Sequence, residues 1–316
     1  MERARHPGAD LGREARSPAH RERSQGLAYG LAAYGFWGFF PIYLKAVARV
    51  PVLELLSHRI VWSAILLLLL VWQQGRFGEV AAAFRQRRSL AVLGATTVLI
   101  AVIWLVYIFS VTHDRLLESS FGYYINPLVN VALGVVLLRE KLAPLVRVAV
   151  AIAAAGVLWL GIHVGRPPWI SLVLAFSFAL YGLLRKVAPV GPLIGLTVET
   201  LLLAPAAAGF LIFASAKGQA AFLSGRPGLD VLLVLGGPVT AIPLLWFAAA
   251  ARRLPLSTIG FLQYISPTLQ FLLAVLVYGE PFDRAKAVAF ACIWAALALF
   301  AYHSVRRRAP EPVVDA

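Results

Sequence analysis

The chain has 316 residues, of which 60% are hydrophobic and only 14% are charged, and its formal net charge is +14 at pH 7. Its mean hydropathy of +0.78 exceeds what the surface of a soluble domain of this size tolerates, which excludes the soluble globular and disordered classes. The composition indicates an all-α integral membrane protein.

The first 25 residues are polar and contain six arginines. They lead into an apolar run without a clear cleavage site. We therefore predict that residues 1–25 form a disordered basic cytoplasmic tail before an uncleaved first helix. A removable signal peptide is the alternative interpretation.

Ten stretches are apolar and long enough to cross a membrane, which takes about 20 residues for ~30 Å of hydrocarbon. They are 26–45, 54–74, 90–110, 117–137, 145–164, 168–187, 193–214, 229–250, 258–278 and 285–303. The joints are short and rich in Pro, Gly and charge. Residues 304–316 are expected to form a cytoplasmic C-terminal tail.

The basic residues follow the membrane topology. Counted alternately along the joints, 20 Lys and Arg fall on the face that holds both termini and 8 on the other face, with Arg59 inside a segment. The positive-inside rule then places both termini in the cytoplasm, which an even number of spans requires. The excess is a topology signal, so we expect no nucleic-acid partner.

The second segment carries polar residues in its first half. Glu54 and His58 are four residues apart and can meet on one helix face, whereas Arg59 points about 100° away from His58. Arg59 either snorkels to the interface or attracts an anionic group of a substrate. At a shift of 140 residues it aligns with Glu199 of the seventh segment, which either carries a coupling proton or is a structural carboxylate bonded to Thr197 or Thr200.

The fourth segment contains "FGYYINPLVN", 121–130, and its neighbourhood recurs in the ninth. "ESSFGYYINPLVNVALGVVLLRE" aligns without a gap onto "TIGFLQYISPTLQFLLAVLVYGE", and 7 of 23 positions match, among them Pro127 with Pro267 and Glu140 with Glu280. We interpret the chain as two five-helix repeats, 26–164 and 168–303. Because five is odd, the second repeat enters the membrane inverted.

Inverted repeats are typical of secondary transporters, whose substrate site lies near the midplane between the halves. Pro127 and Pro267 each remove a helix hydrogen bond halfway through the bilayer. A freed carbonyl in hydrocarbon is costly unless it faces protein or a watery cavity. Alternatively both prolines are tolerated kinks and the nearby amides bond between helices.

Enzyme, metal and cofactor signatures are missing. The sequence has no HExxH, GxSxG, GxxxxGK[ST] or paired CxxC, and its single cysteine, Cys292, excludes an intramolecular disulfide. We therefore expect no enzyme, no cofactor and no metal. A membrane enzyme built on Glu54 and His58 stays a minor alternative.

With these features in place, the sequence resembles the RarD family of EamA-type proteins in the drug/metabolite transporter superfamily, over roughly 26–305. The residues that carry the resemblance are "AAYGFWGFFPIYLK", "HR" at 58–59, "LESSFGYYINPLVN", "LAFSFALYGLLRK" and "RLPLSTIGFLQYISPTLQFLLAVLVYGE". The family usually has Gly-Glu after the fourth helix, and here Arg139 replaces the Gly. The resemblance implies ten helices around a central cavity in a bacterial inner membrane, and efflux of a small organic molecule.

The predicted function is a secondary transporter that exports a small amphipathic metabolite or drug by alternating access, with protons as the candidate coupling ion. The alternatives are a lipid or lipid-linked-sugar flippase and a non-transporting membrane protein, either enzyme or scaffold. The predicted substrate-binding residues are polar or charged and lie inside membrane segments: His58, Arg59, Tyr123, Tyr124, Asn126, Asn130, Glu199, Gln263, Tyr264 and Gln270.

Overall fold

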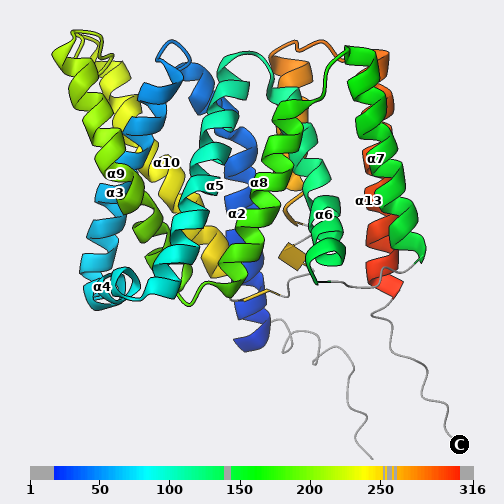
Figure 1. Ribbon diagram of the computed structural model, residues 1–316, viewed down its shortest axis with the longest axis horizontal. Coiled ribbons are helices and arrows are strands. Elements are labelled where there is room, and N and C mark those ends of the chain that lie inside the picture. The colour runs from blue at the N-terminus through cyan, green and yellow to red at the C-terminus, as the bar shows by residue number, and fades with distance from the viewer. Residues whose placement is uncertain (1–17, 139–143, 252, 255–257, 260–261, 307–316) are drawn as a thin grey trace, which may run out of the picture.

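The computed structural model describes residues 18–138, 144–251, 253–254, 258–259 and 262–306, and the regular elements in these residues are helices (Figure 1). The first half of the chain forms α2 (Pro18–Ala46), α3 (Val52–Gln73), α4 (Phe77–Arg85), α5 (Arg87–Thr112), α6 (Leu116–Leu138) and α7 (Pro144–Val164). The second half forms α8 (Trp169–Val187), α9 (Pro192–Ala216), α10 (Pro227–Ala251), α12 (Ile265–Leu272), the π-helical η1 (Leu273–Val277) and α13 (Arg284–Arg306).

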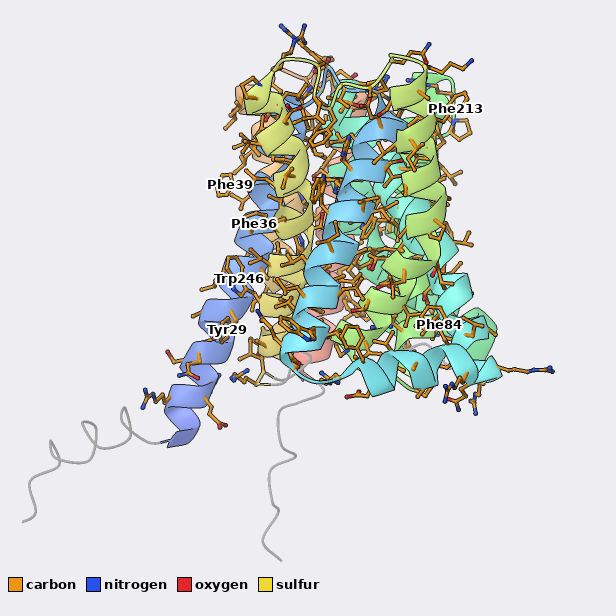
Figure 2. The ribbon with its side chains drawn as sticks, turned by 90° about the vertical axis from the view of Figure 1, so that its left-hand side faces the viewer. Tyr29, Phe36, Phe39, Phe84, Phe213 and Trp246 are labelled. Carbon is orange, nitrogen blue, oxygen red and sulfur yellow. The ribbon has the colours of Figure 1, made fainter. Side chains whose placement is uncertain are left out.

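The protein is a multi-pass helical membrane protein. Among the described residues, seven helices are long and apolar enough to cross a membrane: α2, α3, α5, α7, α9, α10 and α13. Large apolar side chains cover their outward faces, for example Phe39 on α2 and Phe213 on α9, labelled in Figure 2. Charged side chains such as Arg59 and Glu199 are instead buried inside. This inside-out distribution suits a lipid surround.

Two elements in the first half of the chain differ from the sequence prediction. α2 begins at Pro18, so residues 18–25, expected in a disordered tail, are helical; the tail residues 1–17 and 307–316 lie outside the described part. α4 lies between the predicted segments 54–74 and 90–110, where only a joint was expected, yet Val80 and Ala83 are buried on one side of it. They pack against Val71, Leu93 and Ile194. α4 is therefore an amphipathic helix that lies across the end of the bundle (Figure 2).

The helices span the molecule from one end to the other. One end holds the start of α2 together with α4, and we call it the α4 end (Figure 1). The opposite end holds the α2–α3 and α5–α6 turns and Glu280, and we call it the Glu280 end. Arg59 lies early in α3 and therefore nearer the Glu280 end. Glu199 lies early in α9, which runs the other way, and is therefore nearer the α4 end.

The principal helix contacts join elements far apart in the sequence. α3 packs on α9 and α10, α7 on α13, and α6 on both α8 and α12. α2 packs on α10 and α12, and α5 packs on α8. A single large core of buried apolar side chains connects these helices, with Leu44, Ile108 and Leu174 among its fully buried members.

The predicted segment 258–278 is not one continuous helix. Gln263 and Tyr264 form a turn, α12 starts at Ile265, and the chain passes into η1 at Leu273. Pro267 therefore lies in the first turn of α12, where a backbone N–H has no partner within the helix in any case. α6, in contrast, runs through Pro127 without interruption.

Candidate functional site

The Arg59 side chain is buried between four helices. Its exposed fraction is 3%, and its Nε donates a hydrogen bond of 3.1 Å to the Thr240 hydroxyl on α10. The guanidinium carbon lies 4.9 Å from the ring centre of Phe40 on α2 and 5.3 Å from that of Trp104 on α5. Both distances suit a cation–π contact. Arg59 therefore points into the bundle rather than to a membrane interface.

Two glycines bring α10 against α3 at this point. A Cβ on Gly236 would lie 3.1 Å from Cγ of Arg59, and a Cβ on Gly237 would lie 2.6 Å from the backbone carbonyl carbon of Trp62. Because both glycines lack a side chain, Thr240, one turn farther along α10, comes within reach of Arg59. The "GGP" of this segment is the sequence signal for this contact, and it was not among the predicted features.

Aromatic side chains extend from the guanidinium toward α6. The Phe40 ring stacks on Tyr107 at 6.0 Å between ring centres, and Tyr107 meets Tyr123 edge-on at 5.8 Å. Tyr123, a predicted site residue, thus lies near Arg59, and Tyr107 was not predicted. We call Arg59, Phe40, Trp104, Tyr107 and Thr240 the Arg59 cluster.

His58 faces away from this cluster. Its Nε2 lies 3.9 Å from a carboxylate oxygen of Glu54, as the spacing of four residues predicts. The Glu54 carboxylate also accepts a 2.6 Å hydrogen bond from the backbone N–H of Ala221, and the His58 ring lies 5.0 Å from that of Phe222. Glu54 and His58 therefore hold the α9–α10 loop over the Glu280 end of α3.

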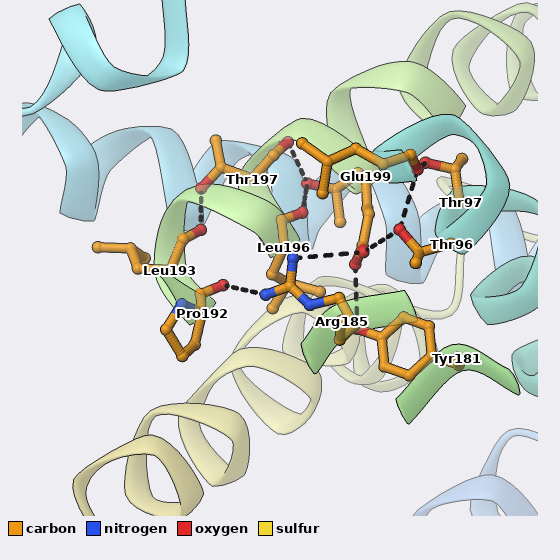
Figure 3. A network of polar contacts seen from close by, with 11 residues as sticks. Thr96, Thr97, Tyr181, Arg185, Pro192, Leu193, Leu196, Thr197 and Glu199 are labelled. Carbon is orange, nitrogen blue, oxygen red and sulfur yellow. Dashed lines mark hydrogen bonds and ion pairs between the residues drawn. The ribbon is translucent and has the colours of Figure 1, made fainter. Parts of the chain in front are cut away.

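Glu199 lies nearer the α4 end than Arg59 does and forms a separate polar network. Figure 3 shows this network from close by. Its buried carboxylate accepts a 2.6 Å hydrogen bond from the Thr96 hydroxyl of α5 and a 3.1 Å hydrogen bond from the Tyr181 hydroxyl of α8. The Arg185 guanidinium of α8 lies 3.7 Å away. We call these four residues the Glu199 network, and it shares no residue with the Arg59 cluster.

The alternative that pairs the Glu199 carboxylate with Thr197 or Thr200 names the wrong partners. Thr197 donates its hydroxyl to the Leu193 carbonyl at 2.8 Å, and Thr200 donates to the Leu196 carbonyl at 2.9 Å. A threonine inside a helix bonds readily to the carbonyl one turn earlier on its own helix. The Glu199 carboxylate is therefore satisfied from α5 and α8 instead.

α6 and α12 are joined around the predicted aromatic residues. The Tyr124 hydroxyl lies 2.6 Å from the Thr268 hydroxyl, and the Tyr124 and Tyr264 rings stack at 6.3 Å between centres. The Ser120 hydroxyl also donates to the Pro267 carbonyl at 2.8 Å. The two proline-containing segments therefore lie side by side and bond to each other directly.

Two of the predicted amide residues donate hydrogen bonds to backbone carbonyls of neighbouring helices. Asn126 donates to the Ala175 carbonyl at 3.1 Å, and Gln270 donates to the Trp37 carbonyl at 3.1 Å. Gln263 is half-buried in the turn before α12. Asn130 belongs to α6, but its side chain lies outside the described part, as does the whole of Glu140.

Glu280 joins the end of η1 to the start of α6 at the Glu280 end. Its two carboxylate oxygens accept hydrogen bonds of 2.7 and 2.8 Å from the backbone N–H groups of Leu116 and Leu117, the first residues of α6. Burial raises the pKa of the Glu280 carboxyl, although these two hydrogen bonds and nearby Lys45 oppose the shift. Lys45 pairs with Asp114 beside it. A carboxylate from the second half thus caps a helix of the first half.

A cavity of about 290 Å³ lies elsewhere, where the Glu280-end parts of α6, α7 and α13 meet. Glu118, Arg166, Asp283 and Lys286 are among the side chains that line it, and none of the ten predicted substrate-binding residues does. Several predicted residues instead lie among packed side chains in separate places. Tyr123 lies near Arg59, Tyr124 stacks on Tyr264, and Glu199 belongs to its own network.

Comparison with known proteins identifies the family. Residues 24–162 match the EamA-like transporter family. The "Uncharacterized transporter YojE" of Bacillus subtilis is 44% identical over 91% of this chain and 97% of its own, and "Protein RarD" of Escherichia coli K12 is 42% identical over 90% and 96%. The chain belongs to the RarD family of EamA-type proteins.

The family assignment confirms the resemblance seen in the sequence, and it places this RarD-family protein among the membrane transporters. A solved crystal structure of 20% sequence identity aligns with a TM-score of 0.56 over 90% of this chain and 99% of that one. At that identity the likeness concerns the fold alone.

Proposed function

We propose that this RarD-family protein is a secondary transporter with ten membrane spans in two inverted repeats, 26–164 and 168–303, and that it exports a small amphipathic metabolite or drug by alternating access. The helix packing carries the proposal. If the two halves are equivalent, each helix of the first half corresponds to one of the second: α2 to α8, α3 to α9, α5 to α10, α6 to α12 with η1, and α7 to α13. The contact of α2 with α10 then becomes that of α8 with α5, and both occur.

The other principal contacts follow the same exchange. The contact of α2 with α12 corresponds to that of α8 with α6, and both occur. The contacts α3–α9, α6–α12 and α7–α13 each join two equivalent helices, so the exchange leaves them unchanged, and they occur as well. The two charged residues follow it as well. Arg59 bonds to Thr240 on the third span of the second repeat, and Glu199 bonds to Thr96 on the third span of the first repeat. Two equivalent halves that meet along such pairs support a rocking motion.

Alternating access requires contacts between the halves that break and re-form. The bonds from Leu116 and Leu117 to Glu280 are such contacts, because they join the first repeat to the second at the Glu280 end. We propose that they open when the substrate leaves on that side. On the same reasoning Glu199, joined to Thr96 across the repeats, is the candidate carrier of a coupling proton.

The orientation follows from charge. α4 and its flanks contain Arg76, Arg85, Arg87 and Arg88, which supports a cytoplasmic α4 end, cytoplasmic termini and an inner-membrane location. Reporter fusions after residue 86 and at both termini test this orientation, and all three are expected to report the cytoplasm. An external signal from the position after residue 86 would contradict both the orientation and the inverted repeat.

The proposed site consists of the predicted residues around the α6–α12 junction, together with Arg59 and Tyr123. The deciding experiment is a metabolite-panel counterflow assay with the purified chain in proteoliposomes. Exchange of a soluble compound supports transport. Exchange of a labelled lipid alone would favour the flippase, and the absence of any exchange by folded protein would favour a non-transporting membrane protein.

A further inference from the structure

We propose that Arg59 and Tyr107 recognise the carboxylate of an organic monoanion that carries a flat aromatic or similarly apolar group. This inference rests on the proposed transport function and names the chemical class of its substrate. Four observations on the Arg59 cluster lead to it, and they concern charge, hydrogen bonding, shape and the number of cations.

The positive charge of Arg59 has no counter-charge in the described part of the chain. Arg59 forms no ion pair with any described carboxylate. Among the described residues, its guanidinium contacts neutral groups: the Phe40 and Trp104 rings and the Thr240 hydroxyl. An unpaired buried charge costs several kcal/mol, and intramembrane cations usually pair with an anion or serve a pathway. A bound anion would supply the missing charge.

Two hydrogen-bonding groups in the cluster are buried without a partner among the described residues. They are Nη1 of Arg59 and the hydroxyl of Tyr107. Nε of Arg59 is already used by Thr240, so the free edge of the guanidinium is the Nη1 side. A guanidinium N–H and a phenol O–H are both donors, so each can donate to an oxygen of a carboxylate.

The surroundings of these donors indicate the rest of the ligand. Phe40 and Trp104 lie against the guanidinium, and Phe40, Tyr107 and Tyr123 continue as a chain of ring contacts toward α6. Aromatic side chains of this kind favour a flat apolar ligand body, which they contact by stacking or edge-on packing. A strongly hydrated polar body would lose its water without compensation.

The number of cations sets the charge of the ligand. Arg59 is the one cation among the five residues of the cluster, so a carboxylate neutralises it, whereas a phosphate dianion would leave a buried negative charge. Interfacial snorkelling needs an exposed guanidinium, and the 3% exposure of Arg59 argues against it. The geometry therefore favours one carboxylate over both a phosphate and a neutral compound.

The test measures binding to the purified full-length chain in nanodiscs by thermal shift and isothermal titration. The probes are 3-phenylpropanoate, its neutral amide, phenyl phosphate and acetate. We expect the phenylpropanoate to raise Tm and to bind at least tenfold more tightly than the other three. Equal binding of the amide would overturn the recognition of charge, and tighter binding of phenyl phosphate would overturn the monoanion.

Three variants locate the site. Arg59→Lys and Arg59→Gln are expected to lower phenylpropanoate affinity about tenfold to a hundredfold, the range that loss of a charge-assisted hydrogen bond predicts. Tyr107→Phe is expected to lower it about twofold to tenfold. Arg147→Lys on the exposed face of α7 and Tyr29→Phe on the surface of α2 are matched controls, and neither should change the affinity.

The stability of the variants without a probe separates recognition from anchoring. If Arg59 is an unpaired cation kept for binding, Arg59→Gln leaves Tm unchanged or higher, because it removes a buried charge. A lower Tm with unchanged probe affinity would make Arg59 a structural anchor and overturn the inference. Counterflow of neutral compounds that is unaffected by Arg59→Lys would also overturn the recognition of a carboxylate, but it would leave the transport function standing. The absence of exchange of any compound would instead refute the transport function.

Discussion

Gly195 of α9 lies directly against the Arg185 guanidinium of α8, in the space that a side chain would fill. A Cβ at this position would approach the guanidinium carbon to 2.5 Å and would overlap its Nη1. Because Gly195 has no side chain, the guanidinium can lie along α9 and reach Glu199 at 3.7 Å. Gly195 thus controls the distance between Arg185 and Glu199 by leaving room for the guanidinium, although it forms no side-chain bond to either residue.

Gly195→Ala is therefore expected to push Arg185 away from Glu199 without altering either residue. Alanine favours a helix over glycine by up to about 1 kcal/mol, whereas loss of a charged contact to the buried carboxylate costs about 1–3 kcal/mol. We expect a lower Tm than that of Gly209→Ala on the same helix, where a Cβ would meet nothing within 4 Å. Equal Tm values for the two variants would show that the pair does not stabilise the fold.

The polar residues inside the membrane segments could be found from the sequence, but their partners could not. Arg59 and Glu199 stand out in apolar runs because intramembrane charge is rare. Their partners Thr240 and Thr96 come from α10 and α5, and which helices meet depends on close approach at positions such as Gly237. Helical periodicity describes one helix and does not determine which other helix packs on it.

The apolar runs located the long helices because ~20 apolar residues have few alternatives to a span. α4 was missed because its nine residues are short and carry charge at both ends. Tyr107 was missed because one tyrosine in an apolar run reads as packing, and it is set apart by its buried hydroxyl, which has no partner among the described residues. The interruption before α12 was placed at Pro267, whereas the turn lies at Gln263 and Tyr264.

Gly237→Ala is expected to force α10 away from α3. A Cβ there would lie 2.6 Å from both the carbonyl carbon and the carbonyl oxygen of Trp62, and backbone atoms cannot move aside as a flexible side chain can. Overpacking of this kind costs about 1–3 kcal/mol. Unfolding in detergent, followed by tryptophan fluorescence, should show the loss, and Gly228→Ala on the same helix, with open space around it, should not. An unchanged midpoint for Gly237→Ala would mean that the helices separate at little cost.

Glu280→Ala is expected to destabilise the Glu280 end. It leaves the amides of Leu116 and Leu117 without their acceptors, and loss of a helix cap costs about 0.5–2 kcal/mol. Glu280→Gln keeps one acceptor oxygen and should lose less. Glu79→Ala serves as the control, because that carboxylate is exposed and pairs with nearby Arg76. Faster hydrogen exchange at the start of α6 would locate the effect, and unchanged exchange there would refute the cap.

The last prediction concerns the two prolines of the α6–α12 junction. Pro127→Ala restores an N–H that can bond to the Tyr123 carbonyl, and helix propensity favours Ala over an interior Pro by up to about 3 kcal/mol. Pro267 lies in the first turn of α12, so Pro267→Ala should change stability less. The double variant is expected to raise Tm and to stiffen the centre of α6, while counterflow falls more than protein abundance. Pro205→Ala, in the interior of α9 on an exposed face, should raise Tm without slowing counterflow. Full counterflow in the double variant would make both prolines tolerated kinks with no part in the movement of the halves.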